Sequence, residues 1–192
     1  MKVIGLAGRA GSGKSTIARH LEHNQGIEWI DLDSVAWRTY ARGTDVYDRL
    51  VEAFGDGILS ESGDIDRKHL ARSAFATQQS QQLLNEIVHP AVSEAVRSII
   101  RDHEVRGTDV LLIEGALLAT SSYVDRSIYH AIFWLEVSAN TQDQRLQAMG
   151  RSEHAKRGRD VIPVGEVVTV LGEGSVEDVA QRVLQAIADV PG

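Results

Sequence analysis

Short apolar runs alternate along the chain with segments whose apolar residues recur every three or four positions. The first kind of segment predicts strands, and the second predicts helices that bury one face. Strands are expected at 3–7, 27–31, 110–113, 131–137 and 164–171. The run at 110–113 is apolar at every position, which is typical of a strand buried on both faces.

Helical spacing follows each of several turn or cap signals. The segment from Lys14 places its apolar residues on one face. Pro90 is expected to be the first residue of a helix, because proline is favoured there. Two further helices are predicted from capping boxes, in which a hydroxyl residue is followed three positions later by an acid or amide. These pairs are Thr141 with Gln144 and Ser175 with Asp178.

The order of these elements predicts an α/β fold. Strands and helices alternate, apart from a long polar, helical stretch without a convincing strand, and this order favours an open, mainly parallel sheet of five strands with helices on both faces. We expect one domain, 1–192, with a core formed by 1–33 and 106–192. Residues 34–105 are the expected helical insert, and the basic, glycine-punctuated stretch 150–160 is a short lid loop.

Composition excludes several classes of protein. The 192 residues carry a net charge of −7, which disfavours general nucleic-acid binding, because phosphate backbones select basic surfaces. Cysteine is absent, so disulfides and thiolate metal sites are excluded. No stretch approaches 18 apolar residues and no signal peptide is evident, so we expect a cytoplasmic protein without a membrane partner. No obligate protein partner is evident.

The stretch after the first strand carries the clearest chemistry. Gly8-Arg9-Ala10-Gly11-Ser12-Gly13-Lys14-Ser15 matches the phosphate-loop pattern G-x-x-x-x-G-K-[ST], and it stands between a predicted strand and a predicted helix. Backbone N–H groups of such a loop bind phosphates, the lysine reaches the β- and γ-phosphates, and the serine hydroxyl binds Mg²⁺. The expected ATP-binding residues are Gly8, Ala10, Gly11, Ser12, Gly13, Lys14, Ser15 and Thr16.

The remainder of the chain indicates which kind of phosphate-loop protein this is. The guanine motif N-K-x-D of GTPases is absent. An ABC-type ATPase would carry its own signature loop on a larger scaffold. A small-molecule kinase fits, because it needs a nucleotide site, an acceptor pocket and a lid.

A set of short motifs resembles the dephospho-CoA kinase family, in the family's order and over most of the chain. Asp31-Leu32-Asp33-Ser34-Val35-Ala36 is similar to its D-x-D-x-x-A segment, and 63–71 is similar to its G-x-[IL]-x-R-x-x-L stretch. Val88-His89-Pro90 is similar to its [ILV]-H-P signature, and 142–145 to its Q-x-x-R segment. The resemblance implies transfer of phosphate from ATP to the ribose 3′-hydroxyl of dephospho-CoA, with Mg²⁺.

The resemblance also implies roles for residues, each with a structural alternative. Asp33 is the implied catalytic base beside Lys14, or else a helix N-cap. Arg67 and His89 are implied on the acceptor side, or else a solvated charge and a cap or packed histidine. Arg145 is expected near the nucleotide. Glu114 is an acceptor-side residue that can also hold Mg²⁺ through water, or else an acid that simply ends a strand. The lid candidates are Arg151, Arg157 and Arg159.

Two rival functions remain open from the sequence. The first is another small-molecule kinase that acts on a nucleoside or a sugar. The second is a non-catalytic ATP-binding regulator, and the short lid is the feature that supports this alternative.

Overall fold

The computed structural model describes residues 1–22, 26–151 and 162–191. The chain divides into two compact units. The core unit contains Met1–Leu32 and Ile100–Gly192, and the helical unit contains Asp33–Ile99. The predicted insert, 34–105, therefore begins one residue later than the helical unit and extends beyond its end.

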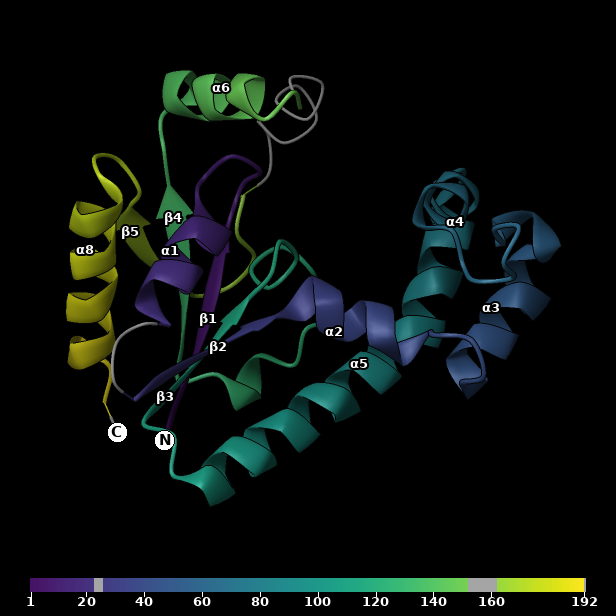
Figure 1. Cartoon of the computed structure of the whole chain (residues 1–192), viewed down its shortest axis with the longest axis horizontal. Coiled ribbons are helices and arrows are strands. Elements are labelled where there is room, and N and C mark those ends of the chain that lie inside the picture. Colours follow the sequence, from purple (N-terminus) through teal and green to yellow (C-terminus); the bar gives the residue numbers. More distant parts are fainter. Residues whose placement is uncertain (23–25, 152–161, 192) are drawn as a thin grey trace. The chain divides into compact units, whose positions relative to one another are not determined.

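The core unit is built on a five-stranded sheet in the order β2-β3-β1-β4-β5 (Figure 1). All four neighbouring pairs are parallel, which confirms the predicted fold class. Because every strand runs the same way, all their carboxyl ends lie along one edge, where open α/β sheets bind ligands. The strands are β1 (Lys2–Gly8), β2 (Ile27–Asp31), β3 (Val110–Glu114), β4 (Ala131–Glu136) and β5 (Val168–Leu171).

Helices α1 (Lys14–Leu21) and α8 (Val176–Asp189) pack together against the sheet. Their apolar faces join strand side chains such as Leu6 and Phe133 in one buried cluster. The predicted capping box of Ser175 and Asp178 is confirmed at the start of α8. Packing of these apolar faces, rather than helix propensity, supplies most of the stability of such short helices.

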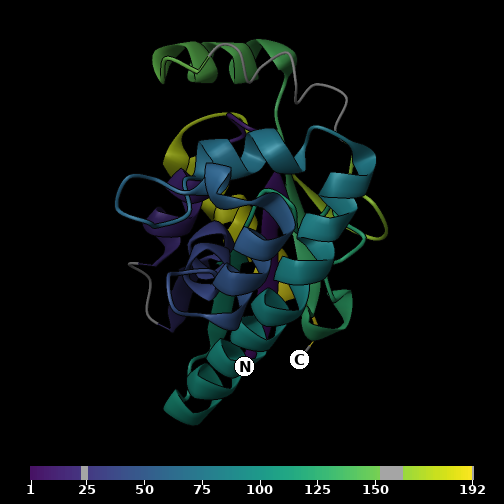
Figure 2. The same cartoon turned by 90° about the vertical axis from the view of Figure 1, so that its right-hand side faces the viewer.

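Helix α6 (Ala139–Ala148) lies beyond the carboxyl edge of the sheet in both views (Figures 1 and 2). Its N-cap is Ser138, whose side chain accepts a hydrogen bond from the Thr141 backbone N–H. The predicted cap at Thr141 is therefore wrong by three positions. A short 3-10 helix, η2 (Arg126–Ile128), precedes β4.

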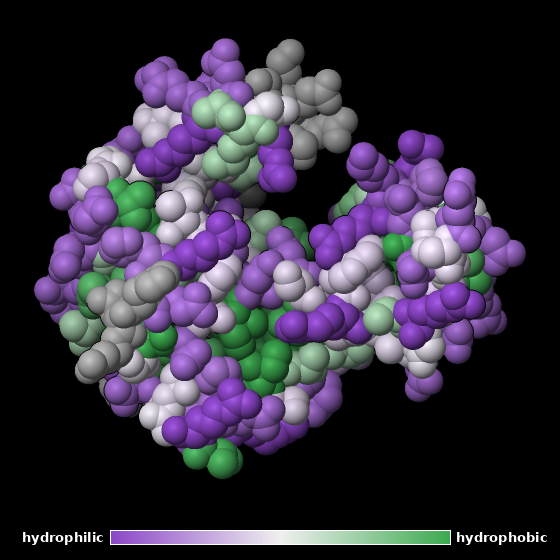
Figure 3. Space-filling view, in the orientation of Figure 1, coloured by the Kyte–Doolittle hydropathy of each residue, from purple (hydrophilic) through white to green (hydrophobic). Residues whose placement is uncertain are grey.

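The helical unit has its own apolar cluster, which includes Leu50, Ile58 and Ile87. Its surface over α3 and α4 is mostly hydrophilic in the view of Figure 3. A lone antiparallel bridge, Leu59 to Ile65, is the β pairing found there among the described residues. The elements are α2 (Leu32–Thr39), α3 (Asp45–Phe54), the 3-10 helix η1 (Asp56–Ile58), α4 (Arg67–Ala74) and α5 (Gln78–Arg106).

Helix α5 corrects the prediction for Pro90, which lies inside the helix rather than at its start. Proline cannot donate the usual backbone hydrogen bond and normally kinks or ends a helix. Here Ile87 is buried in the helical unit, with Val88 and Ala91 packed against the same cluster on either side of the proline. This burial offsets the missing bond. In the described part of the chain, no helix is long and apolar enough to cross a membrane.

Candidate active site

The loop between β1 and α1 is the predicted phosphate loop, and its backbone depends on glycine. Gly13, the N-cap of α1, has a φ of 94°, a conformation that residues with side chains rarely adopt. A Cβ atom on Gly8 would lie 2.7 Å from Ser12 Oγ and 2.9 Å from the Leu135 carbonyl oxygen. The loop thus brings the chain to the positive end of α1, an arrangement that binds phosphate.

Two polar side chains of this loop are buried. Lys14 is 8% exposed, and its Nζ donates to the Arg9 carbonyl oxygen at 3.3 Å. Ser12 is 1% exposed, and its Oγ is buried without a hydrogen-bond partner in the described residues. A buried hydroxyl without a partner costs free energy. A phosphate oxygen in the loop would satisfy such a donor, so both side chains suit an anionic ligand.

A group of oxygen atoms stands beside the loop at the carboxyl edge of the sheet. Ser15 Oγ donates to Glu114 Oε2 at 3.1 Å, and Glu114, the last residue of β3, is 6% exposed. Asp31, the last residue of β2, is opposite Glu114 in the strand register.

These oxygen atoms fit Mg²⁺, which is usually held by a hydroxyl or one or two carboxylates together with phosphate oxygens and water. No group of three or more histidine, cysteine or acidic side chains suited to a metal occurs among the described residues. An ion at this position would therefore need nucleotide phosphates or water to complete its ligands. Glu114 accepts a hydrogen bond from the phosphate-loop serine, and its part in holding Mg²⁺ stays a prediction.

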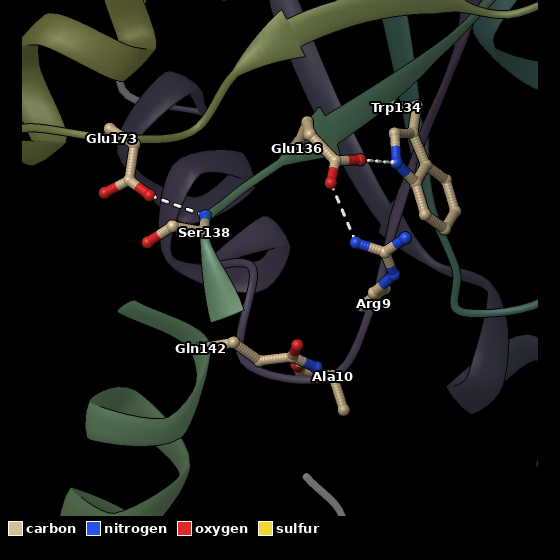
Figure 4. A network of polar contacts seen from close by, with 7 residues as sticks. All are labelled: Arg9, Ala10, Trp134, Glu136, Ser138, Gln142 and Glu173. Atoms are coloured by element: carbon tan, nitrogen blue, oxygen red, sulfur yellow. Dashed lines mark hydrogen bonds and ion pairs between the residues drawn. The ribbon is translucent and has the colours of Figure 1, made fainter. Parts of the chain in front are cut away.

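Arg9, whose position the phosphate-loop pattern leaves unspecified, anchors the loop to β4. Its Nη1 donates to Glu136 Oε1 at 2.7 Å, while Trp134 Nε1 donates to Glu136 Oε2 at 2.5 Å (Figure 4). The guanidinium also lies 5.9 Å from the Trp134 ring. Charge-assisted hydrogen bonds of this kind fix side-chain geometry more firmly than neutral ones. Nothing in the sequence pattern links positions 9 and 136, so this network was not predictable from the sequence.

Helix α6 holds the phosphate loop from the other side. Gln142, which is buried, donates through Nε2 to the Ala10 carbonyl oxygen at 2.8 Å (Figure 4). Arg145 Nη1 donates to the Ser12 carbonyl oxygen at 2.9 Å, and its Nη2 donates to that of Gly172 at 3.1 Å. Arg145 thus lies beside the loop, with backbone carbonyls as partners. Its direct contact with a nucleotide stays a prediction.

Glu173 joins the start of α6 to the turn between β5 and α8. Its carboxylate accepts the Ser138 backbone N–H and the Thr141 hydroxyl, each at 2.7 Å (Figure 4 draws the first bond). The Ser138 N–H, followed by the Thr141 hydroxyl, holds the pKa of Glu173 below its ordinary value. The carboxylate therefore stays charged at neutral pH and keeps both bonds.

Three of the predicted acceptor-side residues, Asp33, Arg67 and His89, lie in the helical unit, whereas Glu114 lies in the core unit. Asp33 is the second residue of α2 and is exposed. The N-cap alternative for Asp33 is wrong, because α2 already begins at Leu32. Arg67 is the first residue of α4, and its guanidinium carbon lies 3.9 Å from the centroid of the Trp37 ring.

His89 lies within α5, so the N-cap alternative for this residue is wrong as well. The side chain is half-buried, and burial lowers its pKa below the ordinary value. The imidazole is therefore neutral at physiological pH. It can donate or accept a hydrogen bond, but it carries no positive charge for a phosphate group.

The lid prediction falls mostly outside the described residues, which exclude Arg157 and Arg159. Arg151 is described and exposed, and its backbone N–H donates to the Leu146 carbonyl oxygen at 2.8 Å.

A cavity of about 510 Å³ lies elsewhere in the core unit, at the amino ends of β4 and β5. Its lining includes Arg126, Tyr129, His130 and Glu166. Because the phosphate loop follows the carboxyl end of β1, this cavity belongs to the opposite edge of the sheet from the loop.

The phosphate loop joins the first strand of an all-parallel sheet to the first helix, and the Ser15–Glu114 pair lies beside it. These features define a P-loop nucleotide-binding protein of the small-kinase type. A sequence model of the dephospho-CoA kinase family matches residues 2–160. The chain belongs to the dephospho-CoA kinase family.

Two relatives illustrate this membership. The dephospho-CoA kinase of Corynebacterium glutamicum is 32% identical over 99% of this chain and 100% of its own length. That of Geobacter sulfurreducens is 32% identical over 95% of each chain. Among solved structures, TT1252 from Thermus thermophilus matches with a TM-score of 0.77 and 27% identity, covering 100% of this chain and 98% of that one. The dephospho-CoA kinase from Campylobacter jejuni matches with a TM-score of 0.63 and 16% identity over 99% of this chain and 98% of that one, which supports the fold.

Proposed function

We propose that this protein transfers the γ-phosphoryl group of ATP to the ribose 3′-hydroxyl of dephospho-CoA, which gives CoA and ADP. The observation that carries the proposal is the family match over residues 2–160, which includes an intact phosphate loop. In the reaction, the 3′-oxygen forms a bond to the γ-phosphorus, and the bond from that phosphorus to the β,γ-bridging oxygen breaks. The proton of the 3′-hydroxyl must pass to a base.

Asp33 is the base that we propose for this proton. A carboxylate is a suitable acceptor when it lies within hydrogen-bond reach of the hydroxyl in the substrate complex. Asp33 is exposed in the first turn of α2, two residues after Asp31 ends β2. The chain thus connects it directly to the carboxyl edge where Ser15 and Glu114 meet.

The phosphate loop and its neighbours supply the positive charge and the positioning that phosphoryl transfer needs. We assign binding of the transferred group to Lys14 and to the loop backbone. Ser15 would bind Mg²⁺, with Glu114 acting through water, and the ion would neutralise charge on the β- and γ-phosphates. Arg67 and His89 are assigned to the acceptor side, and Arg145 and the lid arginines to the nucleotide.

The test is an ADP-release assay with ATP and a panel of acceptors that includes dephospho-CoA, adenosine, other nucleosides and sugars. We expect kcat/KM for dephospho-CoA to be at least about tenfold that of any nucleoside or sugar, because binding energy from the remote pantetheine arm raises the rate of the correct acceptor. A better nucleoside or sugar acceptor would contradict the acceptor assignment and leave a kinase. ATP binding without turnover on any acceptor would favour a regulator.

The role of Mg²⁺ has its own test in the same assay. Chelation of divalent ions should abolish turnover, and added Mg²⁺ should restore it. Glu114→Gln should raise the Mg²⁺ concentration needed for half-maximal rate by about tenfold, because residues that orient metal-bound water typically contribute that much. Glu28→Gln, a change at an exposed position of β2, is the matched control and should leave the requirement unchanged. An unchanged requirement in Glu114→Gln would contradict the assignment.

A further inference from the structure

Three side chains of the helical unit share one face of α2 and its C-terminal end. Asp33, Trp37 and Tyr40 are separated by four and three residues, the spacing that aligns side chains along one side of a helix. The rings of Trp37 and Tyr40 meet edge to face, with centroids 5.1 Å apart and an interplanar angle of 77°. This is a favoured geometry for an aromatic pair. The two rings therefore hold each other in position.

Arg67 reaches this face from α4. Its guanidinium carbon stands 3.9 Å from the Trp37 ring centroid, well inside the distance at which a cation is attracted to an aromatic face. Arg67 is also the first residue of α4, where the helix dipole disfavours a cation. The stacking on Trp37 works against that repulsion. The ring thus holds the Arg67 charge at a helix start, where the dipole disfavours it, which suggests that this charge has a functional role.

The indole limits which part of the guanidinium can meet a ligand. With 3.9 Å between the guanidinium carbon and the ring centroid, the side toward the indole is closed to a ligand, whereas the N–H groups spread outward in the guanidinium plane. That planar fork matches two oxygen atoms of one phosphate group. An arginine immobilised in this way loses less conformational freedom when it binds a ligand, so binding is tighter.

Tyr40 adds a neutral hydroxyl to the same group. Burial raises the pKa of its phenol, the positive charge of Arg67 lowers it, and the negative charge of Asp33 raises it. The phenol is therefore neutral at physiological pH. The edge-to-face contact with Trp37, whose ring also lies against Arg67, places Tyr40 next to this pair.

We propose that Trp37 is a positioning residue that fixes Arg67 for the phosphate groups of the acceptor, and that Tyr40 belongs to the same acceptor-binding subsite. This inference rests on the proposed function, in which the acceptor is dephospho-CoA and carries a pyrophosphate. Trp37 acts through Arg67 rather than by contact with the substrate.

The experiment compares Trp37→Leu, Trp37→Phe, Arg67→Ala and the double variant Trp37→Leu/Arg67→Ala. We expect Trp37→Leu to raise the KM for dephospho-CoA by about tenfold and to leave the KM for ATP within twofold, while Trp37→Phe keeps a ring under Arg67 and stays within about threefold. The double variant should be no worse than Arg67→Ala alone, because the two residues act as one unit. Tyr40→Phe should raise the acceptor KM by a smaller factor.

Arg19→Ala is the matched control, because Arg19 also lies over a tryptophan, with 5.6 Å between its guanidinium carbon and the Trp29 ring centroid, but in the core unit. It should leave the KM for dephospho-CoA unchanged. Multiplicative effects of Trp37→Leu and Arg67→Ala would overturn the positioning role, as would an equal rise in both KM values. If Trp37→Leu fails to fold, a normal acceptor KM in both Arg67→Ala and Tyr40→Phe would overturn the inference.

Calorimetric binding of dephospho-CoA separates this inference from the proposed function. A parent protein that binds dephospho-CoA without turnover would contradict the proposed reaction, and loss of that binding in Trp37→Leu would still support the subsite. A parent protein that does not bind dephospho-CoA at all would contradict both.

Discussion

Lys14 combines a positive charge with near-complete burial, and such a charge costs free energy unless an anion or hydrogen-bond acceptors surround it. The Arg9 carbonyl is one such acceptor. In the proposed reaction the phosphates of ATP would be the main partner. Ser12, with its buried hydroxyl in the same loop, supports the same conclusion.

Lys14→Ala should lower kcat by about a hundredfold or more, because a single donor to the charge of a transition state typically contributes that much. The measurement is ADP release at saturating ATP and dephospho-CoA. Lys2→Ala is a suitable control, because Lys2 is the first residue of β1 and therefore lies at the end of the strand away from the phosphate loop. Its Nζ donates to the Ile187 carbonyl oxygen. Turnover near that of the parent in Lys14→Ala would refute the phosphate-loop assignment.

Asp33→Asn tests the proposed base without changing the size of the side chain. We expect kcat to fall by about 10²–10⁴-fold, or roughly 3–5 kcal/mol of barrier, with little change in substrate binding. Asp45→Asn, in the first turn of α3, is the matched control and should keep kcat. If Asp33→Asn shows normal melting, normal affinities and a kcat within about threefold of the parent, the base lies elsewhere, with Asp31 or Glu114 the next to test.

At the scale of elements, β1, β3 and β4 were predictable because buried parallel strands leave apolar runs in the sequence. Local patterns failed where packing overrides them. Pro90 predicts the start of a helix, yet α5 continues on both sides of the proline, because Ile87 and its neighbours are buried in the helical unit. Thr141 resembles a cap, but Ser138 takes that place.

The site shows the same division between local and distant information. The phosphate loop is contiguous, so its residues could be found from spacing alone. The contacts of Arg9 with Glu136 and of Arg67 with Trp37 join residues far apart in the chain. No periodic pattern encodes such pairs, so only the folded structure supplies them.

The carboxylate of Glu173 gives an element-scale prediction for pH. Its folded pKa is lowered, so the stability that it contributes is fully present above the ordinary glutamate range near 4.5 and declines as pH falls through the lowered folded value. Glu173→Gln should therefore melt at a lower temperature than the parent at pH 7, by a few degrees at most, because the side chain is partly exposed and its charge is screened by water. The difference should shrink as the pH is lowered from 6 to 3.

Thermal melting of both proteins across that range is the measurement. Glu177→Gln is the matched control, because Glu177 is an exposed acid in the first turn of α8. A melting difference between parent and Glu173→Gln that stays constant from pH 6 to pH 3 would contradict the role of the ionised carboxylate.

At the scale of the whole molecule, the chemistry is divided between two compact units. The core unit holds the phosphate loop and the Ser15–Glu114 pair, and the helical unit holds Asp33 and the Trp37–Arg67 stack. The sequence predicts one domain with a helical insert at 34–105, whereas the helical unit is Asp33–Ile99, and α5 continues beyond its end into the core unit.

This division predicts that the two substrates protect different parts of the chain from hydrogen exchange. Ligand binding suppresses local opening of the segments that it contacts. MgATP should slow amide exchange in residues 8–16 and at the start of α6, both in the core unit. Dephospho-CoA should slow exchange in 33–40 and 67–74, in the helical unit.

Exchange measured by mass spectrometry with each ligand alone and with both is the test. Lys14→Ala should lose the protection by MgATP and keep that by dephospho-CoA, while Arg67→Ala should do the reverse. Protection by dephospho-CoA confined to the core unit would contradict the assignment of the helical unit to the acceptor, whatever the rate of turnover.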